Sequence, residues 1–432
     1  MKAQALLSAP IVPTLARLSA PGVLLVAFQT LVSVGDTYFV GRLGTGPLAG
    51  LALVFPLIML LQMTSAGAMG GGVSSAIARA LGSGDAPLAR RLVVHALAIA
   101  AAMGTVFTVL ILLFGPWIYG LLGGQGETLE HALRYSNIVF GGALAVWIAN
   151  TLSSVLRGTG NMLAPALTLI GAALVHLPLS ATLVARIGIA GAGIAYVTTF
   201  SIAALVMATI VWRSSLLRPQ AGDWRLEARL FREILRVGAI SMLSALQTVL
   251  TAVIITGFVG RYGAAALAGY GVGLRLELLQ IPLVFAIGQA LVVLVGTHIG
   301  AGRAERARQI AWIGAGFAAS ISLAIGITVS IFPLAWVGLF STDPAVLESG
   351  SSYLRTVAPF YPFLAAGIAL YFASQGAGRV LRPVLAGTVR LVLVIAGGIA
   401  AVSLQGVFIV IAAAMIAFGA LTMWFVHSAE WK

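Results

Sequence analysis

The 432-residue chain contains no cysteine and only two lysines, Lys2 and Lys432. The absence of cysteine excludes disulfides, redox thiols and thiolate metal sites. Because lysine is confined to the two ends, no interior residue can act as a Walker-type phosphate lysine or a Schiff-base lysine. The composition therefore excludes an ATP-driven pump of the P-loop type.

Charged residues are also scarce, at 9% of the chain against roughly 25% in an ordinary soluble domain. Hydrophobic residues make up 60%, and the mean hydropathy is +1.05, which indicates that lipid is the solvent of this protein. In hydrocarbon every backbone polar group must be paired within a helix or a closed barrel. Long, non-alternating apolar runs predict twelve membrane-spanning helices, over residues 14–40, 48–77, 92–120, 132–156, 163–185, 189–212, 235–260, 267–296, 309–333, 351–375, 384–404 and 406–427.

One segment of the chain occurs twice. Residues 39–50 and 258–269 are identical at eight of twelve positions, and glycine pairs such as 82/84 with 300/302 and 158/160 with 376/378 keep nearly the same offset. An internal duplication in an apolar chain is typical of transporters that bind their substrate near the interface of two repeats. Because each repeat has an even number of spans, both repeats enter the bilayer from the same side.

The predicted fold is therefore an all-α polytopic membrane protein with twelve transmembrane helices in two six-helix lobes. The N-lobe is expected to comprise residues 1–218 with helices 1–6, and the C-lobe residues 219–432 with helices 7–12. A pseudo-two-fold axis along the membrane normal should relate the two lobes.

The basic residues predict the orientation of the chain. The formal charge of +13 could suggest a nucleic-acid partner, but fifteen arginines lie in the connections after even-numbered spans and only five on the opposite side. This distribution fits the positive-inside rule better than nucleic-acid binding. We expect both termini to be cytoplasmic and the chain to be a multi-pass protein of a bacterial inner (plasma) membrane that acts as a monomer.

Only two of the twelve acidic residues, Asp36 and Glu277, fall within the predicted spans. An ionisable group in hydrocarbon is costly unless it faces a cavity or a partner, so both are functional candidates. Asp36 shares one face of the first helix with Gln29 and Ser33, and Pro21 is a candidate hinge in that helix. Two structural alternatives are an Asp36–Arg42 ion pair at the interface and a permanently neutral, buried carboxyl.

Glu277 has a structural alternative of its own, an ion pair with Arg275, while Gln280 one turn later would extend a polar cavity. His176, followed one turn later by Ser180, is either a proton carrier or a packing residue. Further polar helix faces carry Asn150 with Ser153 and Ser154, Thr198 with Thr199, and Gln247 with Thr251.

Several motifs together resemble the multidrug and toxic compound extrusion (MATE) family over essentially the whole chain. They are the residues 36–44 after Pro21, the segment 156–161, and the segments 271–277 and 296–303 around helix eight. The resemblance implies two lobes of six helices and antiport of cationic, amphipathic compounds against protons or sodium ions. It also implies that Asp36 is the coupling acid of the N-lobe, supported by Asn150 and Thr198.

The chain departs from the family pattern in helix five. Where prokaryotic members with a well-formed N-lobe cation site have an Asn and, one turn later, an Asp, this chain has His176 and Ser180. The oxygen cage that sodium prefers is thus incomplete, which favours proton coupling through Asp36 with His176. Sodium coupling stays the alternative. Gln29, Ser33, Gln247, Thr251, Glu277 and Gln280 are the candidate cavity residues, and no metal or organic cofactor is expected.

Two other classes of function compete with this interpretation. A flippase of lipid-linked oligosaccharides or peptides would have a similar fold, but its cleft should hold several arginines, and the spans offer only Arg275 and Arg390. A membrane-embedded enzyme is disfavoured because no His-Glu-x-x-His or Gly-x-Ser-x-Gly motif occurs. We therefore expect small cationic molecules and the lipid bilayer as partners, and no nucleic acid.

Overall fold

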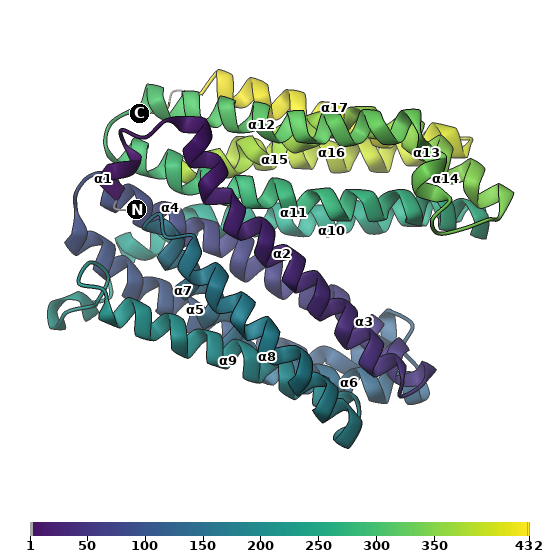
Figure 1. Ribbon diagram of the computed structural model, residues 1–432, viewed down its shortest axis with the longest axis horizontal. Helices are drawn as coiled ribbons and strands as arrows, with labels where there is room; N and C mark the ends of the chain where they lie inside the picture. The colour runs from purple at the N-terminus through teal and green to yellow at the C-terminus, as the bar shows by residue number, and fades with distance from the viewer. Residues whose placement is uncertain (1–2, 430, 432) are drawn as a thin grey trace. The chain divides into compact units, whose positions relative to one another are not determined.

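The computed structural model describes residues 3–429 and 431, which fold into helices (Figure 1). The first repeat consists of α1 (Ala3–Leu6), α2 (Ile11–Gly41), α3 (Thr45–Gln62), η1 (Met63–Met69), α4 (Gly70–Gly82), α5 (Ala86–Leu121), α6 (Gly126–Gly141), α7 (Ala143–Gly158), α8 (Leu163–Ile187) and α9 (Ile189–Arg213). The connection η2 (Ala221–Trp224) leads to α10 (Ala228–Gly260), α11 (Ala264–Gly300), α12 (Ala304–Ile331), α13 (Pro333–Val337), α14 (Pro344–Val357), η3 (Ala358–Phe360), α15 (Tyr361–Gly376), α16 (Leu381–Ala400) and α17 (Leu404–His427).

The helices confirm the predicted fold class. Among the described residues, eleven helical stretches are long and apolar enough to cross a membrane, and the pair α6–α7, bent by 49°, makes a twelfth if it counts as one span. Two predicted spans, 309–333 and 384–404, run past the observed helix ends. The second overruns because α16 ends at Ala400, and the Ser403 side chain accepts the Gly406 N–H at 3.1 Å to begin α17. An apolar run does not reveal such a break.

The repeated glycines occupy matching helix ends. Gly84 and Gly302, which follow α4 and α11, have φ of 79° and 70°, and Gly160 and Gly378, which follow α7 and α15, have φ of 84° and 73°. Residues with a Cβ rarely adopt this left-handed conformation, which commonly terminates helices. The sequence repeat therefore encodes a repeat of backbone conformation.

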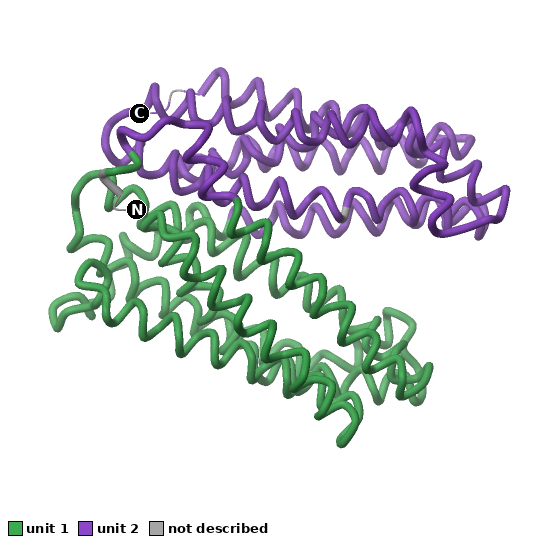
Figure 2. Tube along the Cα trace, viewed as in Figure 1, with its two compact units in different colours: residues 1–6, 20–239 green, residues 7–19, 240–432 purple. Residues whose placement is uncertain are grey.

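The described chain forms two compact units (Figure 2). Unit 1 comprises residues 1–6 and 20–239, and unit 2 comprises residues 7–19 and 240–432. The division lies inside α2 and α10, the first long helix of each repeat, so that each of these helices belongs to one unit at its start and to the other unit afterwards.

Unit 1 ends at Ala239, beyond the boundary at 218/219 that was expected from the sequence, and specific contacts explain the difference. In unit 1, ion pairs join Arg90 to Asp223 and Arg91 to Glu227, and these hold the connection after α9 against α5. In unit 2, the Arg303 and Arg306 side chains donate to the backbone carbonyls of Leu7 and Ala9 at 3.0 and 3.3 Å. The connection is thus part of the first unit, and the segment before α2 is part of the second.

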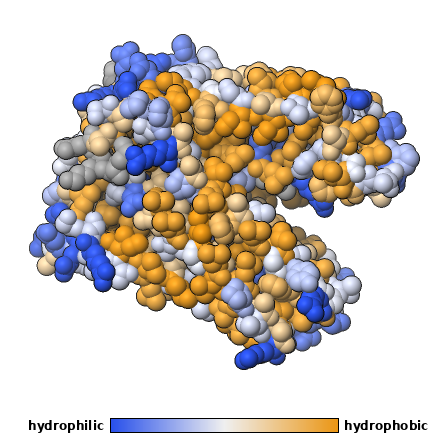
Figure 3. Space-filling model, in the orientation of Figure 1, coloured by the Kyte–Doolittle hydropathy of each residue, from blue (hydrophilic) through white to orange (hydrophobic). Residues whose placement is uncertain are grey.

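Apolar side chains cover the flanks of the helices on the face shown in Figure 3, and hydrophilic side chains gather toward helix ends. Inside unit 1, the large side chains of Trp147, Tyr119 and Phe140 are fully buried. Exposed aliphatic residues such as Leu205, at 70%, would be costly in water, but they suit contact with lipid tails.

Candidate coupling site

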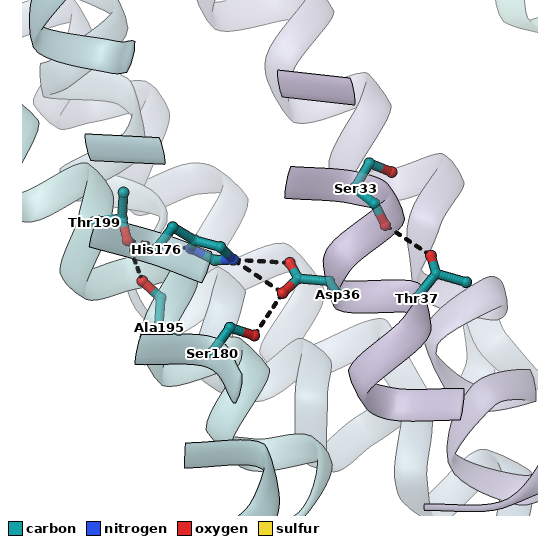
Figure 4. A network of polar contacts seen from close by, with 7 residues as sticks. All are labelled: Ser33, Asp36, Thr37, His176, Ser180, Ala195 and Thr199. Carbon is teal, nitrogen blue, oxygen red and sulfur yellow. Dashed lines mark hydrogen bonds and ion pairs between the residues drawn. The ribbon is translucent and has the colours of Figure 1, made fainter. Parts of the chain in front are cut away.

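Asp36 lies in unit 1 on α2, where its side chain points toward α8 (Figure 4). It is 8% exposed, and its two carboxylate oxygens lie 3.0 and 2.9 Å from His176 Nε2. The Ser180 hydroxyl donates to Asp36 Oδ1 at 2.5 Å. The acid is therefore held by two side chains of one helix, and among the described residues it forms no ion pair with Arg42.

The local sequence explains how these groups meet. His176 and Ser180 are four residues apart and so lie on the same face of α8, and both are at most 1% exposed. On α2, Gly35 precedes the acid, and a Cβ at this glycine would lie 2.6 Å from the Leu177 side chain. The missing Cβ lets α2 and α8 approach closely at the level of Asp36.

Thr199 on α9 fixes the tautomer of His176. The Thr199 hydroxyl donates its only proton to the Ala195 carbonyl at 2.6 Å, so toward His176 Nδ1, at 3.2 Å, it can only accept. Nδ1 therefore carries a hydrogen, and Nε2 faces the carboxylate of Asp36. One further proton is needed between Nε2 and the carboxylate, because otherwise two lone pairs would face each other. We call Asp36 and His176 the dyad.

A second polar network lies in the same unit, on α3, η1, α7 and α9. Asn150 Nδ2 donates to Gln62 Oε1 at 3.0 Å and to Ser65 Oγ at 2.8 Å, and Gln62 Nε2 donates to the Tyr196 hydroxyl at 2.6 Å. Ser65 belongs to η1, a π-helical turn of the kind that often marks functional sites. Asn150 thus contacts this network, whereas the resemblance implied that it supports Asp36.

The remaining N-lobe candidates lie outside the contacts of the dyad. Thr199, the neighbour of the predicted Thr198, contacts His176. Gln29 and Ser33 are exposed on α2, and Pro21 lies inside this helix two residues after Ser19, where the unit assignment changes. A polar pair such as Thr198–Thr199 does not show which of its members faces a neighbouring helix, because that depends on how α9 packs.

The C-lobe candidates lie in unit 2, where Glu277, Gln247 and Thr251 form hydrogen bonds with uncharged groups. The Tyr353 hydroxyl donates to Glu277 Oε1, and Glu277 is 6% exposed. Arg275, the partner of Glu277 in the structural alternative, places its guanidinium 5.1 Å from the centre of the Phe340 ring. Among the described residues no ion pair joins Arg275 to Glu277. Sequence reasoning did not identify Tyr353 as the partner of Glu277, because this tyrosine lies 76 residues later in the chain, on α14.

Three neutral candidates complete this set. Gln247 Nε2 donates to Thr388 Oγ1 at 2.7 Å, and Thr251 Oγ1 donates to the Gln247 carbonyl at 2.7 Å. Gln280 is 3% exposed. Across the described parts of both units, no three His, Cys, Asp or Glu side chains come together as a metal site would require.

The family model described as MatE matches residues 21–182 and again residues 239–400. The chain belongs to the MatE family. The two matches begin 218 residues apart, which is the offset of the repeated glycine pairs. Members of this family are transporters and not enzymes, so the chain is a membrane transporter of the efflux type.

Relatives of known name and a solved structure match more than four fifths of this MatE-family chain. It is 29% identical to a protein of Shewanella oneidensis named FAD transporter, over 85% of this chain and 82% of that protein. It is 24% identical to a probable multidrug resistance protein NorM of Thermotoga maritima, over 83% and 78%. A structure of a MOP superfamily transporter from Pyrococcus furiosus matches with a TM-score of 0.91 at 23% identity, over 99% and 97%, and shows the same fold.

Proposed function

We propose that this transporter exports cationic amphipathic compounds in exchange for protons, and that the dyad of Asp36 and His176 binds the coupling proton. The observation that carries the proposal is the contact of His176 Nε2 with both oxygens of the buried Asp36 carboxylate. The two side chains can share one proton, and histidine is the side chain that most commonly carries protons in transport and catalysis. In this proposal the transporter resides in a bacterial inner membrane, acts as a single chain and has both termini in the cytoplasm.

The charge of the dyad links binding of the coupling proton to binding of the cationic substrate. With the shared proton the dyad is neutral overall, whichever residue holds the proton, and without it the dyad carries one negative charge. The deprotonated dyad attracts a cation in its low-dielectric surroundings, whereas protonation cancels that attraction and favours release. A difference of a few kcal/mol between the two states is enough to shift a two-state conformational equilibrium.

The ligand set favours protons over sodium ions. Sodium prefers several oxygen ligands, and Asp36 has only the Ser180 hydroxyl beside it on α8, while the imidazole of His176 occupies the remaining side. An imidazole nitrogen is a poor sodium ligand but an effective proton acceptor.

A second candidate function is export of a flavin dinucleotide. It is favoured by the relative from Shewanella oneidensis, which is named FAD transporter and matches 85% of this chain. The phosphate groups of such a substrate are negatively charged. The substrate would therefore not compete with a proton for the Asp36 carboxylate, as a cation would. The two candidates therefore predict opposite charge preferences for substrates of similar size.

Reconstituted liposomes with defined gradients test the proposal. We expect an outward-directed movement of a fluorescent cationic dye that is driven by a proton gradient, is abolished by nigericin and is unaffected by a sodium gradient at constant pH. Dye movement that follows only the sodium gradient would contradict proton coupling. If FAD moves and the cationic dye does not, the proposed substrate class is wrong.

Replacing Thr199 by valine should lower the affinity of the dyad for its proton. The substitution removes the acceptor of the His176 Nδ1–H and frees the imidazole to turn its hydrogen toward Asp36. A lost hydrogen bond of about 1 kcal/mol corresponds to a loss of roughly fivefold in proton-driven efflux at a fixed proton gradient. Thr199→Ser, which retains the hydroxyl, should restore the parental rate, and equal rates for parent and Thr199→Val would contradict this role.

A further inference from the structure

The connection between the two repeats docks on a buried histidine of α5. The Glu227 backbone N–H donates to His95 Nε2 at 2.8 Å, and the His95 side chain is fully buried. The Phe231 ring, one turn into α10, lies 4.7 Å from the imidazole in an edge-to-face arrangement. His95 therefore holds the junction at which the connection ends and the second repeat begins.

Hydrogen bonding leaves His95 only one tautomer in this arrangement. Its Nδ1 lies 2.7 Å from the Arg91 carbonyl, which can only accept, so Nδ1 carries the hydrogen. Nε2 faces a backbone N–H, which can only donate, so Nε2 must be an unprotonated acceptor. The docked connection thus requires a neutral imidazole, because an imidazolium would set two N–H groups against each other.

The charged groups of α5 and of the connection that docks on it are paired with one another. On α5 and the connection, Arg90 Nε lies 3.1 Å from Asp223 Oδ2, and Arg91 Nη1 lies 2.8 Å from Glu227 Oε1. Two further basic residues lie on helices that pack against α5: Arg79 on α4, 3.4 Å from Glu233, and Arg157 on α7, bonded to Ser153 and Ser154. A proton on His95 would therefore add a cation beside two ion pairs whose acids, Asp223 and Glu227, are already engaged, on a helix that packs against the helices of two further arginines.

We propose that His95 is a pH-sensitive latch, and that its protonation releases the connection between the repeats from α5. The latch is closed while the imidazole is neutral and accepts the Glu227 N–H, and it opens when His95 Nε2 takes up a proton. The release loses one hydrogen bond, which shifts the ratio of docked to free connection by roughly fivefold. This latch is separate from the dyad and does not depend on the identity of the substrate or the coupling ion.

The absence of cysteine allows a direct test by thiol labelling. Leu230 lies in the first turn of α10 and is 1% exposed, so in Leu230→Cys the sole thiol reacts with a maleimide only when the junction opens. The matched background is His95→Gln, whose side-chain carbonyl can accept the Glu227 N–H but cannot be protonated. Comparing the two at each pH cancels the intrinsic pH dependence of the thiol.

We expect the full-length transporter with His95 to be labelled roughly fivefold faster than the His95→Gln variant at pH 5.5, and at the same rate at pH 8. Equal rates at both pH values would overturn the latch. If His95→Gln does not fold, amide hydrogen exchange of residues 220–232 in the otherwise unchanged protein replaces the comparison. Protection factors that fall when the pH is lowered from 8 to 5.5 support the latch, and constant protection factors refute it.

Discussion

Asp36→Asn should reduce proton-driven dye efflux to the leak rate of protein-free liposomes. An asparagine keeps the size of the side chain and can still bond with His176 and Ser180, but it cannot become a carboxylate. The site then lacks the negative charge that attracts the cation and the group that shares the proton. Initial efflux rates in proteoliposomes under an imposed proton gradient measure the effect.

An acid at the surface supplies the matched control for that substitution. Glu348 on α14 is exposed, so Glu348→Gln removes one carboxylate elsewhere in the chain and should leave the efflux rate unchanged. Heat-induced unfolding should be similar for both variants, which separates a coupling defect from a folding defect. Proton-driven efflux that persists in Asp36→Asn would show that the coupling proton binds elsewhere.

Gly191→Ala should destabilise the transporter and impair transport, although the substitution adds a single methyl group. A Cβ at Gly191 on α9 would lie 2.3 Å from the Leu183 carbonyl carbon on α8, and backbone atoms cannot rotate away. Leu183 is three residues from Ser180, so the helices that carry Ser180 and Thr199 must move apart. Overpacking of this kind costs about 1–3 kcal/mol, which a lowered melting temperature in detergent would reveal.

Gly171→Ala is the control for this prediction. Gly171 lies on α8 as well, but apart from its own stretch of helix no described atom lies within 4 Å of the position that its Cβ would take. Because alanine favours helix over glycine, the melting temperature should stay the same or rise slightly. If Gly191→Ala is as stable and active as Gly171→Ala, then close contact of α8 and α9 is not needed to build the site.

Sequence reasoning was most accurate for features that depend on short stretches of chain. Apolar runs located the spans, since lipid demands about 20 apolar residues whatever a helix packs against. Spacing of four residues correctly placed His176 and Ser180 on one face of α8, and the scarcity of buried acids singled out Asp36. These inferences need only helix geometry and the cost of charge in hydrocarbon.

Features that depend on helix packing could not be predicted in this way. Thr198 and Thr199 differ by about 100° around α9, and only packing decides that Thr199 contacts His176. The partner of Glu277 is Tyr353 on another helix, whereas sequence proximity suggested Arg275. Likewise, nothing in the local pattern around His95 indicates that the connection folds back onto it.

The assignment of the starts of α2 and α10 to opposite units bears on the ancestry of the chain. Residues 7–19 group with the second unit, and residues up to 239, including the start of α10, group with the first. If the two repeats arose by duplication, a half-length ancestor built in this way would have placed the start of its first helix in the compact unit of a second copy, as domain-swapped dimers do.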